Sequence, residues 1–124
     1  MIVGLGVELV DVARFDAALE RFGERLRGRL FTQGERAFAA RRVRDGEGLA
    51  ARFAAKLAAR RALACGPLGW SEVEVVREDG QAPSLRLHGE AAKAARALGV
   101  TRVSLTLTHD PTWCIGQVVL EDDP

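Results

Sequence analysis

The sequence contains no tyrosine, one methionine, two tryptophans and two cysteines among its 124 residues. Cys65 and Cys114 have no paired spacing to each other, so the sequence predicts no disulfide framework. Neither cysteine is spaced with His88 or His109 in a way that indicates a zinc site. No apolar run approaches the roughly 20 residues that a membrane span needs. Internal repeats, low-complexity tracts and linkers are also absent. These absences exclude disulfide-rich, membrane-spanning and repeat proteins.

The composition, 48% hydrophobic and 28% charged, is typical of a soluble globular protein. The chain is long enough for one domain, which we expect to span residues 1–124. Its first residues are apolar but lack a basic leader and a small-residue cleavage site. We therefore expect a reduced, cytoplasmic protein that is not attached to a membrane.

Lysine is scarce, and the net charge of +1 hides an uneven distribution of charge. Residues 1–66 carry 13 basic and 8 acidic side chains, whereas residues 67–124 carry 5 and 9. Residues 21–61 alone carry 12 basic and 4 acidic ones. Such a surface attracts a phosphate-bearing ligand or an acidic protein, although a compositional bias toward arginine gives the same count. The stretch lacks any nucleic-acid-binding motif, so we expect no nucleic-acid partner.

Alternating side chains predict a strand over residues 2–10, with Val3, Leu5, Val7 and Leu9 on one face. Gly4, Gly6 and Glu8 lie on the other face. The two glycines leave room either for a ligand beside Glu8 or for tight packing against a helix. Asp11 is placed to cap a helix that runs to about residue 22.

Thr32 and Glu35 have the spacing of a capping box, which predicts a helix from residue 33 to about 43. Residues 44–48 are expected to break it, and a longer helix follows over residues 49–64. One face of this long helix carries six alanines, at positions 51, 54, 55, 58, 59 and 62, and suits packing on a sheet. The rest of its surface carries Leu49, Phe53, Lys56, Leu57, Arg60 and Arg61.

A period of two then predicts strands over residues 72–76 and 84–88, joined by a turn at residues 79–80. A helix over residues 89–98 ends at Gly99, and strands over 102–108 and 113–120 follow. Helices in the first half and antiparallel pairs in the second favour an α+β fold. We expect a small domain in which the long helix packs on an antiparallel sheet.

Four short stretches resemble one family. They are GLGVE at residues 4–8, RFAAKLA at 52–58, DGQAP at 79–83 and SLTLTHD at 104–110. In this order and spacing, and over essentially the whole chain, the sequence resembles the holo-(acyl-carrier-protein) synthases, the small 4′-phosphopantetheinyl transferases. The resemblance implies a homotrimer with coenzyme A at each subunit boundary and Mg²⁺, or Mn²⁺ in its place, on the pyrophosphate.

The reaction that the resemblance implies belongs to fatty-acid biosynthesis and lipid metabolism. The 4′-phosphopantetheine group moves from coenzyme A to a serine of apo acyl carrier protein, which gives the holo-carrier protein and adenosine 3′,5′-bisphosphate. This is a phosphoryl transfer, so the protein has to hold the diphosphate, neutralise its developing charge and align the serine.

The resemblance also assigns roles to individual residues. It implies that Glu8 is a metal ligand and that Glu8, Arg61 and His109 are catalytic. The implied coenzyme A contacts are Arg52, Phe53, Lys56, Thr108 and His109. The implied contacts to the acidic carrier protein are Arg14 and Arg21. Taken without the resemblance, His109 is an ordinary strand-end histidine, and helix arginines such as Arg52 lie on a solvated face.

The sequence departs from the family at both metal-binding positions. Glu8 stands where the family has aspartate, and Leu57 stands where it has its second metal-binding carboxylate, a glutamate. Arg61 replaces the usual lysine, which keeps the charge but removes a group that can accept a proton. Glu8 is then the remaining ligand, because Mg²⁺ often binds one or two carboxylates plus substrate phosphates. These departures predict reduced or lost transfer; the alternative is a non-catalytic homologue that binds coenzyme A or carrier protein.

Overall fold

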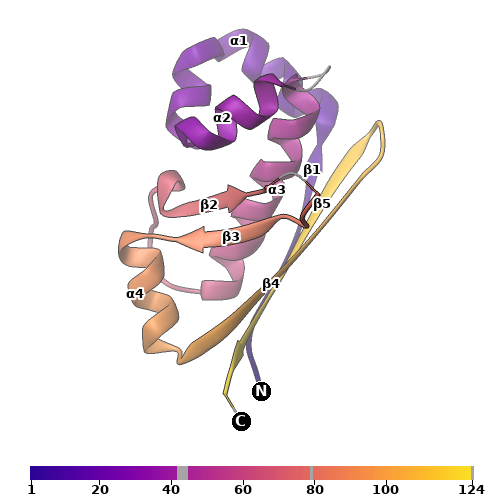
Figure 1. The fold of residues 1–124 in the computed structure, drawn as a ribbon. Helices are drawn as coiled ribbons and strands as arrows, with labels where there is room; N and C mark the ends of the chain where they lie inside the picture. Colours follow the sequence, from indigo (N-terminus) through magenta and orange to yellow (C-terminus); the bar gives the residue numbers. More distant parts are fainter. Residues whose placement is uncertain (42–44, 79, 124) are drawn as a thin grey trace.

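The computed structural model describes residues 1–41, 45–78 and 80–123 of the chain. Its elements are β1 (Ile2–Asp11), α1 (Val12–Leu30), α2 (Gln33–Ala40), α3 (Asp45–Leu63), the 3₁₀ turn η1 (Trp70–Glu72), β2 (Val73–Val76), β3 (Ser84–Leu87), α4 (Gly89–Ala97), β4 (Val100–His109) and β5 (Trp113–Asp122). Figure 1 shows α3 running along one long sheet, with α1 and α2 at one end of the molecule and the short β2–β3 hairpin beside α3. The predicted α+β fold, with a long helix packed on an antiparallel sheet, is confirmed.

The long sheet has the strand order β1-β5-β4, and both pairings are antiparallel. Glu8 of β1 and Leu107 of β4 both face Gly116 of β5 in the register. The two chain ends meet at one end of this sheet, where the Met1 amine lies 3.2 Å from Asp122 Oδ1. Among the described helices, none has the length and apolar character that a membrane crossing requires.

Glycines let α3 approach this sheet closely. A Cβ atom built on Gly4 would collide with the Ala62 carbonyl oxygen, and one on Gly6 would collide with that of Ala58. A Cβ on Gly116 would lie 2.6 Å from the carbonyl carbon of Ala54. The alanines of α3 that face the sheet are buried. The glycines of β1 therefore serve tight packing against a helix, which is the second of the two alternatives predicted from the sequence.

The opposite face of the long sheet is uncovered in a single chain. Leu5, Val7 and Leu9 of β1 are 54%, 48% and 57% exposed, and Ile115 of β5 lies beside them in the register. The apolar face of β1 thus points away from the protein interior, since the bare glycine face is the one that packs on α3.

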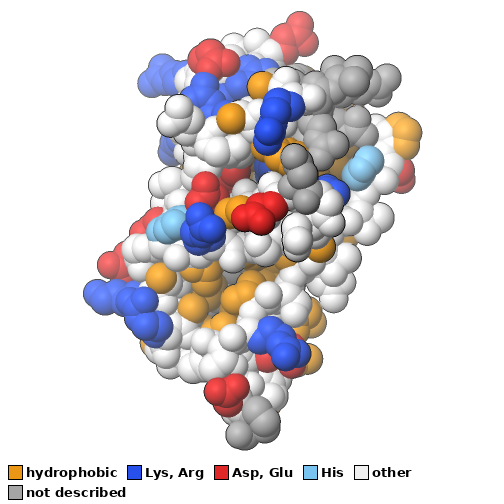
Figure 2. Space-filling view, in the orientation of Figure 1, with side chains coloured by type: hydrophobic (Ala, Val, Ile, Leu, Met, Phe, Trp, Pro, Cys, Tyr) orange, Lys and Arg blue, Asp and Glu red, His pale blue; other side chains and the backbone are white. Residues whose placement is uncertain are grey.

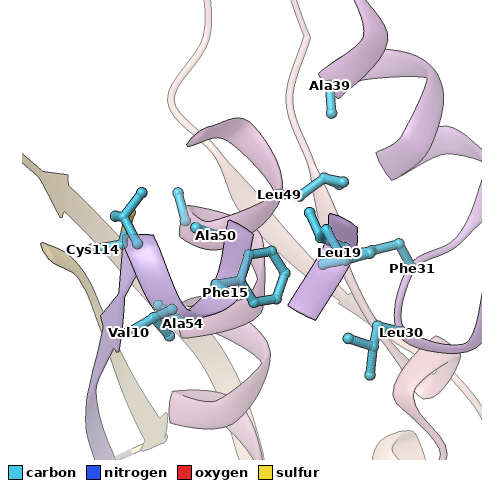
Figure 3. Packing of buried hydrophobic residues seen from close by; sticks show 12 residues of the cluster. Val10, Phe15, Leu19, Leu30, Phe31, Ala39, Leu49, Ala50, Ala54 and Cys114 are labelled. Carbon is cyan, nitrogen blue, oxygen red and sulfur yellow. The ribbon is translucent and has the colours of Figure 1, made fainter. Parts of the chain in front are cut away.

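The core between α1, α2 and α3 combines aliphatic side chains with the rings of Phe15 and Phe31 (Figure 3). The Phe15 ring stacks on Phe53 with 5.2 Å between centroids and meets Phe31 edge-on at 6.2 Å. Asp11 accepts a hydrogen bond from the Arg14 backbone N–H, which confirms the predicted helix cap. This core fixes the two short helices against the first half of α3.

Three helix boundaries differ from the prediction. The first helix does not end near residue 22 but continues to Leu30 across a kink at Gly23, whose φ of 58° only glycine adopts easily. The long helix begins at Asp45, so the break predicted over residues 44–48 is wrong for 45–48, and residue 44 lies outside the described residues. Packing of Leu49 and its neighbours outweighs the weak helix propensity of the glycines there. The second helix ends at Ala40; the rest of its predicted span to 43 is not described beyond residue 41.

A buried ion pair joins α3 to α2. Lys56 Nζ lies 2.7 Å from Glu35 Oε1, and both side chains are fully buried. The ammonium also donates to the Trp70 carbonyl at 2.9 Å, while Glu35 accepts from the backbone N–H groups of Thr32 and Val75. Burial lowers the pKa of Lys56, and the neighbouring Glu35 carboxylate opposes that shift. The pair ties α2, α3, η1 and β2 together.

The same network reaches the β2–β3 hairpin through Glu74. Thr32 Oγ1 donates to Glu74 Oε2 at 2.9 Å, and His88 Nε2 lies 3.0 Å from Glu74 Oε1. The hydrogen bond to His88 is the main reason why the pKa of Glu74 is lowered. The capping box predicted at Thr32 is present, and its glutamate, Glu35, also pairs with the buried Lys56.

We expect Gly6→Ala to lower the free energy of unfolding by about 2–3 kcal/mol, because the new methyl group meets the rigid backbone of α3. Urea denaturation measures this loss. Gly28→Ala in α1 is the matched control, since its nearest heavy atom would be Arg36 Nη1 at 3.8 Å. Equal stabilities of the two variants would show that the close contact has no energetic weight.

We expect Lys56→Met to lower the free energy of unfolding by about 3–5 kcal/mol, because Glu35 is left as a buried, unpaired charge. Adding Glu35→Gln to that variant should restore part of the loss. Lys93→Met is the control, since the exposed pair Lys93–Glu90 contributes about 1 kcal/mol or less. A double variant as unstable as the sum of its single variants would contradict the coupling.

Candidate active site

An open cavity of about 520 Å³ lies where the end of α3 passes β1. It is lined by Glu8, Leu57, Arg60, Arg61, Cys65, Gly66 and Pro67. The glycine contacts show that α3 runs antiparallel to β1, because Gly4 meets Ala62 and Gly6 meets Ala58. Helix side chains lean toward the helix N-terminus, so a side chain from the last turn of α3 reaches back toward Glu8.

An ion pair between Glu8 and Arg61 crosses this cavity. Arg61 Nε donates to Glu8 Oε1, and the Arg61 side chain is 65% exposed while that of Glu8 is 22% exposed. The neighbouring Arg60 guanidinium lies over the Trp70 ring at 4.1 Å, a cation–π contact that orients it. The described lining of the cavity therefore carries two guanidinium groups and one carboxylate.

These residues do not fit a magnesium ion. Mg²⁺ usually binds one or two carboxylates plus substrate phosphates and waters, but the one carboxylate on the described lining already accepts from a guanidinium, whose positive charge repels a cation. Leu57, at the family's second ligand position, is an apolar side chain packed against the core cluster. Within the part of the chain that the structure describes, no group of three or more His, Cys, Asp or Glu side chains is placed to hold a metal ion.

The three predicted coenzyme A contacts on α3 lie away from this cavity. Arg52 is 5% exposed and stands over the Phe38 ring at 4.2 Å. Phe53 packs between Phe15 and Trp70. Lys56 is completely buried, so it offers no surface to a ligand in a single chain. In a single chain the Lys56 ammonium pairs with the Glu35 carboxylate of the capping box and donates to the Trp70 carbonyl, and its contact with coenzyme A stays a prediction.

His109 and Thr108 lie at the end of β4, and both are exposed. In the sheet register His109 faces Cys114, while Glu8 faces Gly116 from the opposite edge strand. A single chain therefore does not bring His109 or Thr108 to the cavity at Glu8. The turn after His109 is fixed by Asp110, whose carboxylate accepts from the backbone N–H groups of Trp113 and Thr112, and these bonds lower the pKa of Asp110.

Arg14 and Arg21 are both exposed on α1. They are seven residues apart, which is two helical turns, so they share one face. The guanidinium of Arg21 lies over the ring of Phe22, which is 53% exposed. Figure 2 shows arginine side chains over α1 and α2 at the upper end of the molecule, with acidic side chains among them.

Sequence reasoning missed one feature of the cavity and one of the core. Arg60 was interpreted only as a solvated helix arginine, although it lines the cavity and lies over Trp70. Glu35 was interpreted only as a helix cap. A pattern in the sequence indicated its partner: Lys56 follows Leu49 and Phe53 at spacings of seven and three, so it shares the stripe that packs into the core.

Comparisons with known proteins agree with this fold and with these motifs. A family model described as the 4′-phosphopantetheinyl transferase superfamily matches residues 4–114. The holo-[acyl-carrier-protein] synthase of Anaeromyxobacter sp. (strain K) is 48% identical over 126 residues, which cover 98% of this chain and 97% of that protein.

Solved structures give the same result. The holo-[acyl-carrier-protein] synthase of Neisseria meningitidis matches with a TM-score of 0.88 and 26% identity, covering 98% of this chain and 100% of that one. A holo-(acyl-carrier-protein) synthase from Bacillus anthracis, solved in complex with CoA (3′,5′-ADP), matches with a TM-score of 0.78 and 30% identity over 99% of both chains. The resemblance seen in the sequence is thereby confirmed, and the chain belongs to the holo-[acyl-carrier-protein] synthases of the 4′-phosphopantetheinyl transferase superfamily.

Proposed function

We propose that this protein transfers the 4′-phosphopantetheine group of coenzyme A to a serine of an apo acyl carrier protein. The observation that carries the proposal is the near-complete match in sequence and fold to holo-[acyl-carrier-protein] synthases, one of them solved with CoA (3′,5′-ADP). Residues 1–124 then act as one domain, and the reaction takes place in the cytoplasm as a step of fatty-acid biosynthesis.

The reaction forms one bond and breaks one. The serine oxygen bonds to the phosphorus that carries the pantetheine arm, the diphosphate bond from that phosphorus breaks, and adenosine 3′,5′-bisphosphate leaves. Arg61 stabilises the phosphate charge but does not take the serine proton, because a guanidinium stays protonated. Leu57 cannot accept that proton either, so it passes to water.

The active protein in this proposal is a homotrimer. The exposed apolar side chains of Leu5, Val7, Leu9 and Ile115 support it, since such a face is usually covered in the assembled protein. Thr108 and His109 lie on β4 of the same sheet but do not reach the cavity at Glu8 within one chain. In a trimer the coenzyme lies between subunits, where His109 and Thr108 of a neighbouring chain contact its phosphates or the attacking hydroxyl.

The carrier protein docks on α1 in this proposal. Arg14 and Arg21 present positive charge on one face of α1, which complements an acidic helix. Such contacts mainly accelerate and orient the encounter, so they weaken as salt concentration rises.

Leu57 is the observation that favours a second candidate, a homologue that binds coenzyme A or carrier protein without transfer. It replaces a carboxylate with an apolar side chain beside the Glu8–Arg61 pair. If transfer does occur, the loss of this carboxylate at Leu57 explains why it is slow. The two candidates differ in one observable, the appearance of modified carrier protein.

Intact-mass analysis of apo acyl carrier protein, incubated with coenzyme A, MgCl₂ or MnCl₂ and this protein, tests the function. We expect a phosphopantetheine mass gain that accumulates slowly, and faster accumulation with a Glu8→Asp, Leu57→Glu double variant. Leu98→Glu, which adds a carboxylate to an exposed site on the far end of α4, is the control for the added charge. No mass gain with the natural chain, but gain with the double variant, would support the non-catalytic candidate.

Light scattering after size exclusion tests the trimer. The natural chain should elute with three times the 13.4 kDa mass of one chain. Val7→Glu should give a folded monomer, because a charge at the centre of the exposed apolar face cannot be buried without a partner. A monomeric natural chain, or a trimer unaffected by Val7→Glu, would exclude this face as the interface.

A further inference from the structure

The cavity at the end of α3 has the charge of an anion site. Its described lining carries the guanidinium groups of Arg60 and Arg61 and a single carboxylate, that of Glu8. A divalent cation placed beside Glu8 would lie next to the Arg61 guanidinium that Glu8 already binds, and like charges at that distance repel. A phosphate group placed there meets two positive groups.

Arg61 is held in a position that suits phosphate binding. Glu8 accepts from Nε, so this bond leaves unused the outer edge of the guanidinium, on which each Nη nitrogen carries one N–H. The side chain is 65% exposed, which leaves these donors open to a ligand. A guanidinium fork binds two phosphate oxygens at once.

Arg60 adds a second fixed charge. Its guanidinium lies 4.1 Å from the Trp70 ring centroid, and it lines the same cavity as Arg61. Leu57, between these arginines and the core, contributes no charge that would repel a phosphate. A diphosphate carries charge on two phosphorus centres, so two adjacent guanidinium groups match it.

We propose that this cavity binds the diphosphate of coenzyme A through Arg61 and Arg60 without a divalent cation. Glu8 is then a positioning residue that holds the Arg61 guanidinium and not a metal ligand. The proposal rests on the proposed function, because that function supplies coenzyme A as the ligand. Arginine side chains of this chain, and not a metal ion, then neutralise the charge of the diphosphate.

Isothermal titration calorimetry of coenzyme A into the full chain tests the proposal. The titration is run in EDTA and again in MgCl₂ at matched ionic strength. We expect coenzyme A to bind in EDTA, with a Kd that MgCl₂ changes by less than about threefold. Loss of binding in EDTA together with binding in MgCl₂ would overturn the proposal.

Variants separate the roles of the two sides of the ion pair. Arg61→Gln should weaken binding in EDTA about tenfold or more, and Arg61→Lys less, because lysine keeps the charge but not the fork. Arg96→Gln, which removes an exposed arginine of α4 outside the cavity lining, is the control. An unchanged affinity in Arg61→Gln would overturn the assignment of Arg61.

Glu8→Gln distinguishes a positioning residue from a metal ligand. Glutamine keeps an oxygen that accepts from Arg61 Nε and removes a charge that repels phosphate, so affinity in EDTA should be unchanged or higher. Leu57→Glu should make binding depend on MgCl₂, and Leu57→Gln of similar size should not, because only the first adds a second carboxylate. Weaker binding of Glu8→Gln in MgCl₂ with no change in EDTA would instead identify Glu8 as a metal ligand.

The coenzyme A binding experiment and the transfer experiment can succeed or fail independently of each other. Metal-free binding of coenzyme A without modified carrier protein would support this inference while contradicting transfer. If transfer and the binding of coenzyme A both require a divalent cation, the transfer function is supported and this inference is contradicted.

Discussion

The close contact between α3 and the long sheet determines where every other part of the site lies. Gly4, Gly6 and Gly116 remove the Cβ atoms that would otherwise meet the α3 backbone, and the alanines of α3 fill the remaining space. Because the helix runs antiparallel to β1 at this distance, its last turn lies beside Gly4, and the Arg61 side chain reaches back to Glu8. The Glu8–Arg61 pair is thus a consequence of a packing contact made entirely by small residues.

The other side of α3 faces a different environment, and this explains why its charged residues differ so much. Lys56 points into the core, where Glu35 and the Trp70 carbonyl satisfy its ammonium. Arg61, little more than one turn later, lies in the open cavity. Whether a positive side chain of α3 is buried or exposed therefore depends on what packs against its face of the helix. The buried pair holds α2 and the β2–β3 hairpin on α3, while the exposed pair is available to a ligand.

Membership in a family of transferases does not by itself fix how phosphate charge is neutralised here. Of the two carboxylates that the resemblance leads one to expect, Glu8 keeps one on a longer side chain and Leu57 removes the other, and the cavity beside them carries two arginines. A guanidinium and a divalent cation both stabilise phosphate charge, but only the guanidinium is part of the chain. The Glu8–Arg61 pair favours neutralisation of phosphate charge by a guanidinium, because it holds the Arg61 side chain in the cavity.

The sequence alone determined the fold class, most elements, the helix caps at Asp11 and Thr32, and the family, because periodicity, capping spacing and short motifs are local patterns. It left open whether the glycines of β1 serve a ligand or a helix, and it placed Lys56 and Arg61 on one charged face. Tertiary structure decided both, since the close approach of α3 and the burial of Glu35 bring together residues that are far apart in the chain. Burial and pairing depend on which surfaces meet in space, and no spacing along the sequence records that.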